Sequence, residues 1–495
     1  MSSGSSVEGR KYAEDTKRSM IDTDAESSDR ALKSRFVAIA AAIVLLALLL
    51  RAFYLFDAKV ENPIAGDINQ YVLYAWNMTH ADTFSSTLPS DGPIIPDSYR
   101  GPGYPAMLAV AIRLAGNAGL YLRAAGHGRM ALVAEPATWI AYTYVAQAIL
   151  GALTVLLAIA VARFWLGRSP SLCVGVLTAL WPHLISFTGV LLSETLFGFV
   201  LLLAVWLLLR AQRRNSVWLA AGSGLTFAAA YLVNPLIALF PLVAGGALLF
   251  RRQAQLAVVL VAIYLIGPSG WALRNAAIPR PAASYERAAQ NFVQGSWPIY
   301  LDALNARFSN PIADAVYRSE ADEEQAFLAK PSTGLRLMAD RMKQRPGYYL
   351  TWYLLKKPFS LWDWGVHVGS GDIYFLVTPV SPFTHVPALK WMKAAFEMFN
   401  PLFFALALLA TLVIALRFLR RSSKAGFAEG IIALLLLYLT AIHTVLQAEP
   451  RYSVPYRPEE LLMAVTAAVW LVDRIVRRHG KNEPGHARTI ATPAE

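Results

Sequence analysis

Three acidic residues lie beside long apolar segments of this chain, where a charged side chain needs either a partner or a function. They are Asp67, Glu194 and Glu449. Three basic residues hold comparable positions and are candidate partners, namely Arg100, Arg274 and Arg451. A carboxylate accepts protons, and a guanidinium binds a carboxylate or a phosphate through two parallel hydrogen bonds. These residue types therefore suit proton transfer next to a bound anion.

Asp67 stands in the segment AGDINQYVLYAWNM, at the start of a predicted helix. Gly66 frees the backbone there, and an aspartate can cap the helix that follows. Tyr71, Tyr74 and Met78 repeat along one face, as in a helix that lies on a membrane surface. From spacing alone, a helix cap without any catalytic role is the simpler interpretation of Asp67.

The segment YRGPGYP, residues 99–105, predicts a rigid turn that leads into another helix. A helix-entry turn is the favoured local interpretation. It does not explain why Arg100 stands beside Tyr99 and Tyr104 at the membrane surface. An arginine in such a place suits binding of a phosphate head group.

Three further short motifs have structural interpretations that compete with functional ones. Ser193-Glu194 interrupts an apolar stretch and can be a turn between two spans. Arg274, three residues after Trp271, can be a cation that reaches the interface beside a belt aromatic. Glu449-Pro450-Arg451-Tyr452 forms a stiff turn, in which a Glu449–Arg451 surface pair would contribute little.

The elements that must position these residues are membrane spans. Of the 495 residues, 56% are hydrophobic and only 16% are charged. The apolar residues form blocks of roughly twenty, which is the length that crosses a bilayer. The first block, 36–56, has no cleavage signal after it and is interpreted as a retained span. The single Cys173 excludes intramolecular disulfides.

Basic residues lie at alternate ends of these blocks, so the positive-inside rule accounts for the net charge of +12 and no nucleic-acid partner is predicted. Ten spans are expected, at about 36–56, 139–164, 172–192, 195–209, 218–232, 236–250, 256–273, 396–418, 428–446 and 460–476. Tyr104–Ala115 is a competing span, but it has only twelve residues and carries Arg113. We interpret it as an interfacial or re-entrant helix.

The predicted fold is therefore an all-α polytopic membrane protein with two large extracytoplasmic loops. A disordered cytoplasmic tail, 1–35, precedes a transmembrane catalytic module, 36–275, whose first outer loop is 57–138. The second outer loop, 276–391, contains amphipathic helices at 334–344 and 348–364 that can lie on the membrane. Transmembrane helices at 392–476 and a cytoplasmic tail, 477–495, complete the chain.

The order of these motifs resembles the GT-C superfamily of membrane glycosyltransferases. That order is Gly-Asp after the first span, Pro-Gly-Tyr-Pro, Ser-Glu between two spans, Trp-x-x-Arg-Asn at a span end and Glu-x-Arg-Tyr before the last span. The resemblance covers roughly residues 36–475 and is nearest to the protein O-mannosyltransferase and aminoarabinose transferase branch. No single motif decides it.

The resemblance implies an enzyme of the cell envelope that moves a sugar from a polyprenyl phosphate to an outer-face acceptor, usually with inversion. Asp67 matches the catalytic carboxylate of the first loop and would act as general base, while Arg100, Arg274 or Arg451 would hold the phosphate. Glu194 would orient the acceptor or pair with an arginine. Tyr71, Tyr104, Glu449 and Tyr452 would complete the substrate site. Ile68 follows Asp67 where protein-mannosylating members have Asp-Glu, which puts a protein acceptor in doubt against a lipid or glycan.

Charge alternation predicts both termini in the cytoplasm and the first loop outside, and the resemblance implies a bacterial inner-membrane protein with its active site on the outer face. No metal site is predicted, because no His/Cys ligand cluster occurs, although carboxylates could hold a divalent cation. A lipid-linked sugar flippase or transporter is an alternative, but it favours charges near the midplane and paired halves. A glycan polymer ligase is a second alternative, which would use the same kind of donor.

Overall fold

The computed structural model describes residues 32–88, 92–116, 120–125, 129–134, 138–278, 283–365, 372, 376–420 and 426–480. Most of the two predicted tails, 1–35 and 477–495, lies outside these residues. Within them, six helices are long and apolar enough to cross a membrane, or seven if one bent pair is a single span. The chain is therefore a multi-pass integral membrane protein.

The candidate spans agree closely with the apolar blocks of the sequence. They are the N-terminal helix Leu32–Asp57, α4 (Thr138–Ala162), α7 (Glu194–Arg214), α10 (Ala254–Ala276), α18 (Pro387–Leu419) and α19 (Phe427–Val445). The bent pair is α5 (Arg168–Leu180) followed by α6 (Pro182–Ser186) and η2 (Phe187–Gly189), with an angle of 57°. Pro182 has no backbone N–H to donate, so the helix cannot continue straight through it.

The predicted count of ten spans is not established. The three remaining blocks are also helical: α8 (Val217–Val233), η3 (Pro235–Ile237) with α9 (Phe240–Phe250), and α21 (Arg457–Gly480). The first two are short for a bilayer, and α21 begins and ends with charged residues. Around α7, a continuous apolar core joins α4, α8, α10, α19 and α21.

The first loop contains α2 (Asp67–His80) and α3 (Gly103–Leu114), which pack on each other. It also contains an antiparallel hairpin of β1 (Leu120–Ala125) and β2 (Arg129–Ala134), in which Leu120 pairs with Ala134. The helical fold is confirmed, and this pair of strands is an addition to the predicted all-α architecture. Its sequence signal was two short runs, 120–125 and 129–134, separated by Gly126-His127-Gly128.

The second loop is helical over most of its described length. It contains α11 (Ala283–Gly295), α12 (Tyr300–Ala306), α13 (Pro311–Ala329), α14 (Pro331–Gln344), α15 (Pro346–Thr351), η4 (Trp352–Lys356) and α16 (Lys357–Leu361). The amphipathic helices predicted at 334–344 and 348–364 correspond to α14 and to the series α15, η4 and α16. Short helices α17 (Pro382–His385), α20 (Pro450–Ser453) and η5 (Val454–Tyr456) precede the later long helices.

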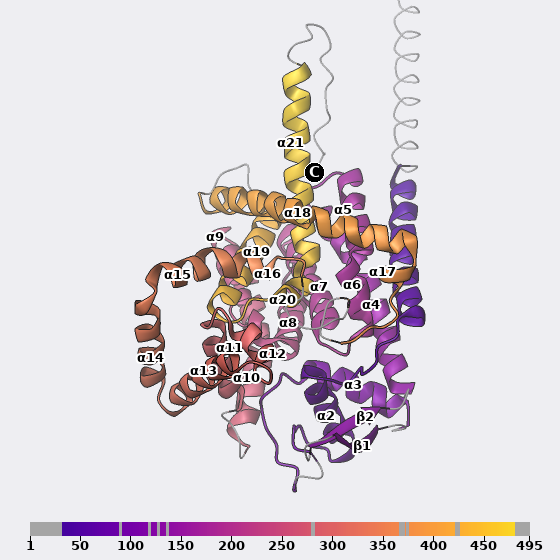
Figure 1. The fold of residues 1–495 in the computed structure, drawn as a ribbon. Coiled ribbons are helices and arrows are strands. Elements are labelled where there is room, and N and C mark those ends of the chain that lie inside the picture. Colours follow the sequence, from indigo (N-terminus) through magenta and orange to yellow (C-terminus); the bar gives the residue numbers. More distant parts are fainter. Residues whose placement is uncertain are drawn as a thin grey trace, which may run out of the picture.

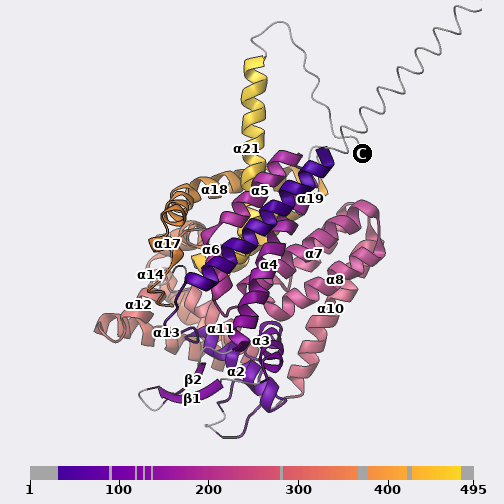
Figure 2. The same ribbon diagram turned by 90° about the vertical axis from the view of Figure 1, so that its right-hand side faces the viewer.

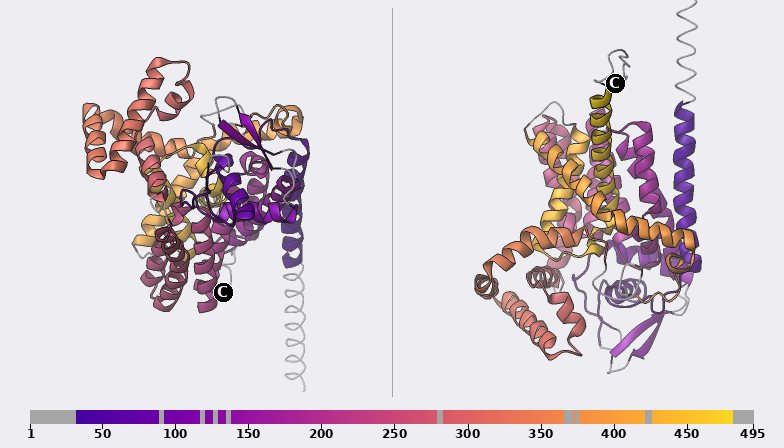
Figure 3. Two further views of the ribbon diagram at one scale, coloured as in Figure 1. Left: turned by 90° about the horizontal axis from the view of Figure 1, so that it is seen from below. Right: turned by 45° about the horizontal axis from the view of Figure 1, so that its top comes forward.

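Two opposite ends of the molecule can be distinguished in Figure 1. The start of the N-terminal helix and the end of α21 lie at one end, whereas α2, α3 and the hairpin lie at the other (Figures 1 and 2). Helices α11–α14 project beside the first loop at that second end (Figure 3). The two loops are joined by a bridge between Lys59 and Val380.

Candidate active site

A cavity of about 790 Å³ lies where the first loop meets the ends of several long helices. Its walls come from α2, the turn before α3, the start of α7, the ends of α8, α10 and α19, one face of α11, and α20. Six of the nine site residues predicted from the sequence line it: Asp67, Tyr71, Arg100, Glu194, Arg451 and Tyr452. Segments far apart in the chain therefore converge on this cavity.

Asp67 is held between two arginines. Arg100 Nη2 donates to Asp67 Oδ1 at 2.7 Å, and Arg451 Nη2 donates to Asp67 Oδ2 at 2.9 Å. The helix cap of α2 is Gly66, whose φ of 54° lies in the left-handed region, and no side chain caps the helix. The interpretation of Asp67 as a plain helix cap is thus wrong, because both carboxylate oxygens bind guanidinium groups instead.

The electrostatic state of Asp67 follows from these contacts. Burial by itself would raise the pKa of the carboxyl, but the charges of Arg100 and Arg451 outweigh burial and hold its pKa well below the ordinary value. Asp67 in turn outweighs the effect of burial on Arg100 and raises the pKa of its guanidinium. The carboxylate is therefore ionised at neutral pH, but it is a weak base while both arginines are bound to it.

Arg100 is fixed on every side. Its Nε donates to Gln70 Oε1 at 2.7 Å, and its guanidinium lies 5.0 Å from the ring centre of Tyr71. The turn that carries it fits tightly against the end of α8, since a Cβ on Gly101 would come within 2.5 Å of the Leu232 carbonyl oxygen. The glycines of the YRGPGYP motif therefore let the turn approach α8 and place Arg100 in the cavity.

Glu194 is the first residue of α7 and is almost completely buried. Its Oε1 lies 3.1 Å from Arg451 Nε, so it forms an ion pair with an arginine. Arg451 thus contacts Asp67 through Nη2 and Glu194 through Nε. The neighbouring Ser193 Oγ lies 3.5 Å from the Tyr71 hydroxyl oxygen. These contacts connect the start of α7 to α2 and α20.

Arg287, on α11, was not among the predicted site residues, yet it lines the cavity. Among the described residues, no carboxylate oxygen lies within ion-pair distance of its guanidinium, which rests 5.6 Å from the Tyr99 ring. Burial and then the nearby charge of Arg100 lower its pKa. The sequence signal was a polar stripe on α11, formed by Arg287, Gln290, Asn291 and Gln294 at helical spacing.

Three predicted site residues lie outside this cavity. Tyr104 is fully buried, donates to Gln147 Oε1 at 3.0 Å and supports the Tyr71 ring edge-on. Arg274 binds the backbone of the first loop, with Nη2 donating to the Phe84 oxygen at 3.2 Å. Glu449 lines a second cavity next to the first. The placement of Arg274 indicates that it ties the first loop to α10, and does not support its role as a phosphate ligand.

Among the described residues, no group of three or more His, Cys, Asp or Glu side chains could hold a metal ion. The expectation of an enzyme without a metal, with a divalent cation as the alternative, stays a prediction. Tyr452, which also lines the cavity, donates its hydroxyl to Gln447 Oε1 at 2.9 Å. The polar groups at this site are therefore arginines, carboxylates, amides and tyrosines.

No protein-family model and no curated protein matches the chain. Among solved structures, it is similar to the oligosaccharyltransferase AglB from Archaeoglobus fulgidus in complex with an inhibitory peptide and a dolichol-phosphate. The TM-score is 0.49 at 15% identity, over 93% of this chain and 53% of that one. The chain thus spans about half the length of that protein.

It is also similar to ArnT from Cupriavidus metallidurans bound to undecaprenyl phosphate, with a TM-score of 0.35, 13% identity and coverage of 88% of this chain and 77% of that one. Both neighbours are membrane glycosyltransferases of the GT-C superfamily, which the sequence motifs resemble. Because both TM-scores are below 0.5, we base the function on the residues of the site.

Proposed function

We propose that this protein is a membrane glycosyltransferase that moves a sugar from a polyprenyl-phosphate-linked donor to a hydroxyl of an acceptor. One observation carries the proposal: an ionised carboxylate, Asp67, shares a cavity of about 790 Å³ with three arginines. Only such a site offers a proton acceptor and an anion receptor to the same pair of substrates.

The phosphate of the donor is assigned to Arg287 together with Arg451. Arg287 has no carboxylate partner among the described residues, so it can accept an anion without losing an existing ion pair. Arg451 is already shared between Asp67 and Glu194. The remaining wall includes Leu232, Leu236 and Leu239 at the ends of α8 and η3, and Leu239 is 56% exposed. An apolar wall that is exposed beyond the end of α8 fits a lipid-linked donor.

Donor binding would also activate Asp67. An anion at Arg287 draws Arg451 towards itself and weakens the ion pair between Arg451 and Asp67. The pKa of Asp67 then rises, since two of the three arginine charges that lower it, those of Arg451 and Arg287, are shared with the phosphate. Arg100 remains on Asp67 because Gln70 and Tyr71 fix it, so the carboxylate keeps its position as it becomes a stronger base.

The chemical step is a displacement at the anomeric carbon. The acceptor oxygen forms a bond to C1 while the bond from C1 to the phosphate oxygen breaks, and its electron pair stays on the phosphate. The proton of the acceptor hydroxyl passes to Asp67. Because the second carboxylate of the cavity, Glu194, is almost completely buried and paired with Arg451, we propose one displacement with inversion and no glycosyl-enzyme intermediate.

The proposed orientation follows the basic residues. Arg163, Arg210, Arg251 and Arg417 lie at the helix ends opposite the first loop, which the positive-inside rule assigns to the cytoplasm. The active site then faces outward and both chain ends face inward. We propose the inner membrane of a bacterium as its location and a lipid or glycan as its acceptor, in line with Ile68 after Asp67.

The test of this function is transfer of radiolabelled sugar from a polyprenyl phosphate to extracted membrane acceptors, by the purified full-length protein in nanodiscs. Asp67→Asn should lower the rate roughly 10²- to 10⁴-fold, which is the contribution of a general base. The matched control is Asp82→Asn in the same loop, because the Asp82 side chain is 94% exposed. Normal transfer by folded Asp67→Asn protein, or movement of unmodified lipid without transfer, would refute the proposal.

A further inference from the structure

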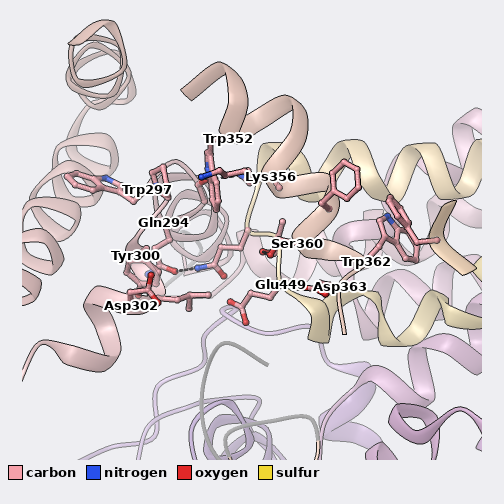
Figure 4. Close-up of a pocket in the computed structure, with 18 of the residues that line it drawn as sticks. Gln294, Trp297, Tyr300, Asp302, Trp352, Lys356, Ser360, Trp362, Asp363 and Glu449 are labelled. Carbon is pink, nitrogen blue, oxygen red and sulfur yellow. Dashed lines mark hydrogen bonds between the residues drawn. The ribbon is translucent and has the colours of Figure 1, made fainter. Parts of the chain in front are cut away.

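A second cavity, of about 630 Å³, shares Gln294 and Gln447 with the first. Figure 4 shows residues that line this second cavity. Its walls come from α11 and α12 on one side, η4 and α16 on another, and the middle of the long apolar helix α18. Aromatic side chains dominate it: Trp297, Tyr300, Trp352, Phe359, Trp362 and Phe404. No residue assigned to the transfer step lines it, so the function proposed above leaves it without an occupant.

The two cavities differ in charge. The first is lined by three arginines and two carboxylates, Asp67 and Glu194. The second is lined by three carboxylates, Asp302, Asp363 and Glu449, and by two lysines, Lys356 and Lys357. Lys357 is fully buried and donates to the backbone carbonyls of Gly295 and Leu446, so it does not face a ligand as a free cation. An anionic phosphate is therefore favoured in the first cavity and disfavoured in the second.

The second cavity has an apolar wall on one side and acidic side chains on another. Pro401, Phe404, Ala405 and Leu408 belong to α18, a candidate membrane span, and form its apolar wall. The carboxylates of Asp302 and Glu449 lie at the other side, on segments outside the spans (Figure 4). Carboxylate oxygens accept hydrogen bonds from hydroxyl groups, and aromatic faces pack on the C–H groups of a sugar ring. A lipid with an uncharged, hydroxylated head group matches this distribution.

The two cavities share one thin wall. Gln294 and Gln447 line both, and Gln447 Nε2 donates to Gln294 Oε1 at 2.6 Å. Behind this pair, α11 and the end of α19 approach so closely that a Cβ on Gly295 would lie 2.2 Å from the Leu446 oxygen. Lys357 holds the same two backbone segments together. The side-chain amides are therefore the part of the wall that can turn aside while the backbone stays fixed.

We propose that the second cavity binds the acceptor, a lipid with an uncharged hydroxylated head group, and that its hydroxyl reaches Asp67 past the Gln294–Gln447 pair. The approach of the acceptor hydroxyl to Asp67 rests on the proposed transfer function, whereas binding of the lipid in the second cavity does not. Donor and acceptor then enter from different sides, with the lipid phosphate at the arginines and the acceptor head group at the aromatic and acidic wall.

Binding is tested without any requirement for transfer. The probe is a glucosyl diacylglycerol with a photoreactive group on its sugar, added to the full-length protein in phosphatidylcholine nanodiscs. Saturable labelling is expected on peptides 297–302, 352–363 or 400–408, with undecaprenyl phosphate unable to compete. Labelling confined to the first cavity, competition by undecaprenyl phosphate, or non-saturable labelling would overturn the proposal. If labelling occurs as expected and no sugar is transferred, only the proposed transfer function fails.

Two variants of α18 sharpen the test. Ala405→Trp fills the second cavity, whereas Leu412→Trp places the same ring on an exposed position of α18 outside it. Ala405→Trp should abolish labelling and raise the KM for the acceptor at least tenfold, with the KM for the donor unchanged. Leu412→Trp should change neither value. A rise in donor KM with an unchanged acceptor KM would assign this cavity to the donor and refute the inference.

Discussion

At the scale of single residues, the centre of this protein is a carboxylate between two guanidinium groups. Such a carboxylate is held in position but is a poor proton acceptor, because an adjacent positive charge stabilises its ionised form. The two arginines differ in freedom: Arg100 is fixed by Gln70 and Tyr71, whereas Arg451 is shared with Glu194. The difference suits Arg100 to positioning Asp67 and Arg451 to binding the substrate.

Arg287 is proposed to bind the donor phosphate, whereas Arg274 holds the first loop in place, and substitutions should separate these two roles. Arg287→Gln should raise the KM for the polyprenyl-phosphate donor about tenfold or more, since a hydrogen bond to a charged group contributes about 1.5–3 kcal/mol. Arg274→Gln should leave the donor KM unchanged and lower the unfolding temperature, because Arg274 binds the Phe84 and Asp97 carbonyls of the first loop. Initial rates and thermal unfolding measure both. Equal effects of the two variants on donor KM would contradict this assignment.

Sequence reasoning found the residues whose motifs stand at span ends and missed those inside the second loop. Asp67, Arg100 and Arg451 could be chosen because charges next to apolar blocks require an explanation. Their mutual contacts could not be predicted, since Arg451 lies 384 residues from Asp67 in the chain. Arg287 belongs to an amphipathic helix whose polar stripe is equally typical of a solvated face. Only the fold shows that this stripe faces the cavity.

At the scale of elements, the site depends on close contacts between helix ends. The turn before α3 meets the end of α8 at Gly101, and α11 meets the end of α19 at Gly295. Both glycines face a backbone carbonyl, so any larger residue requires the backbone to move. The positions of Arg100 and of the wall between the cavities are therefore set by backbone packing as well as by side chains.

Lys357 makes the contact between α11 and the end of α19 depend on pH, because it binds the Gly295 and Leu446 carbonyls. Burial lowers the pKa of its ammonium group to about 7, from an ordinary value of 10.5. The unfolded chain therefore binds more protons than the folded chain between these two values, and stability should rise as pH increases through that range. Thermal unfolding at pH 8 and pH 10 measures the rise. Lys357→Met should reduce the increase, and an increase as large as that of the unchanged protein would contradict the prediction.

At the scale of the whole molecule, the first loop and helices α11–α14 lie at the end opposite the start of the N-terminal helix and the end of α21 (Figures 1 and 3). Apolar periodicity and charge alternation were sufficient to predict the helical segments and their order. They could not fix the number of true spans, because α8 and α9 are short and α21 is charged. Nor did they predict the hairpin, since short strands have no long period to detect.

The orientation can be measured with single cysteines in a Cys173→Ser background. Gly347→Cys, in α15, and Gly167→Cys, before α5, both have room for a side chain. In intact cells, a membrane-impermeant maleimide should label Gly347→Cys and not Gly167→Cys. After the membrane is permeabilised, both should react. Labelling of Gly167→Cys alone in intact cells would reverse the proposed orientation and place the cavities on the cytoplasmic side.

The two ion pairs that hold Asp67, with Arg100 and Arg451, have a consequence for the order of events at the site. Under the proposed function, the anion that engages Arg451 is the phosphate of the donor itself. In the proposed mechanism, the guanidinium groups keep Asp67 a weak base until the donor binds, so an acceptor hydroxyl would lose its proton only after that. The proposed mechanism would therefore require the donor to bind before the acceptor reacts.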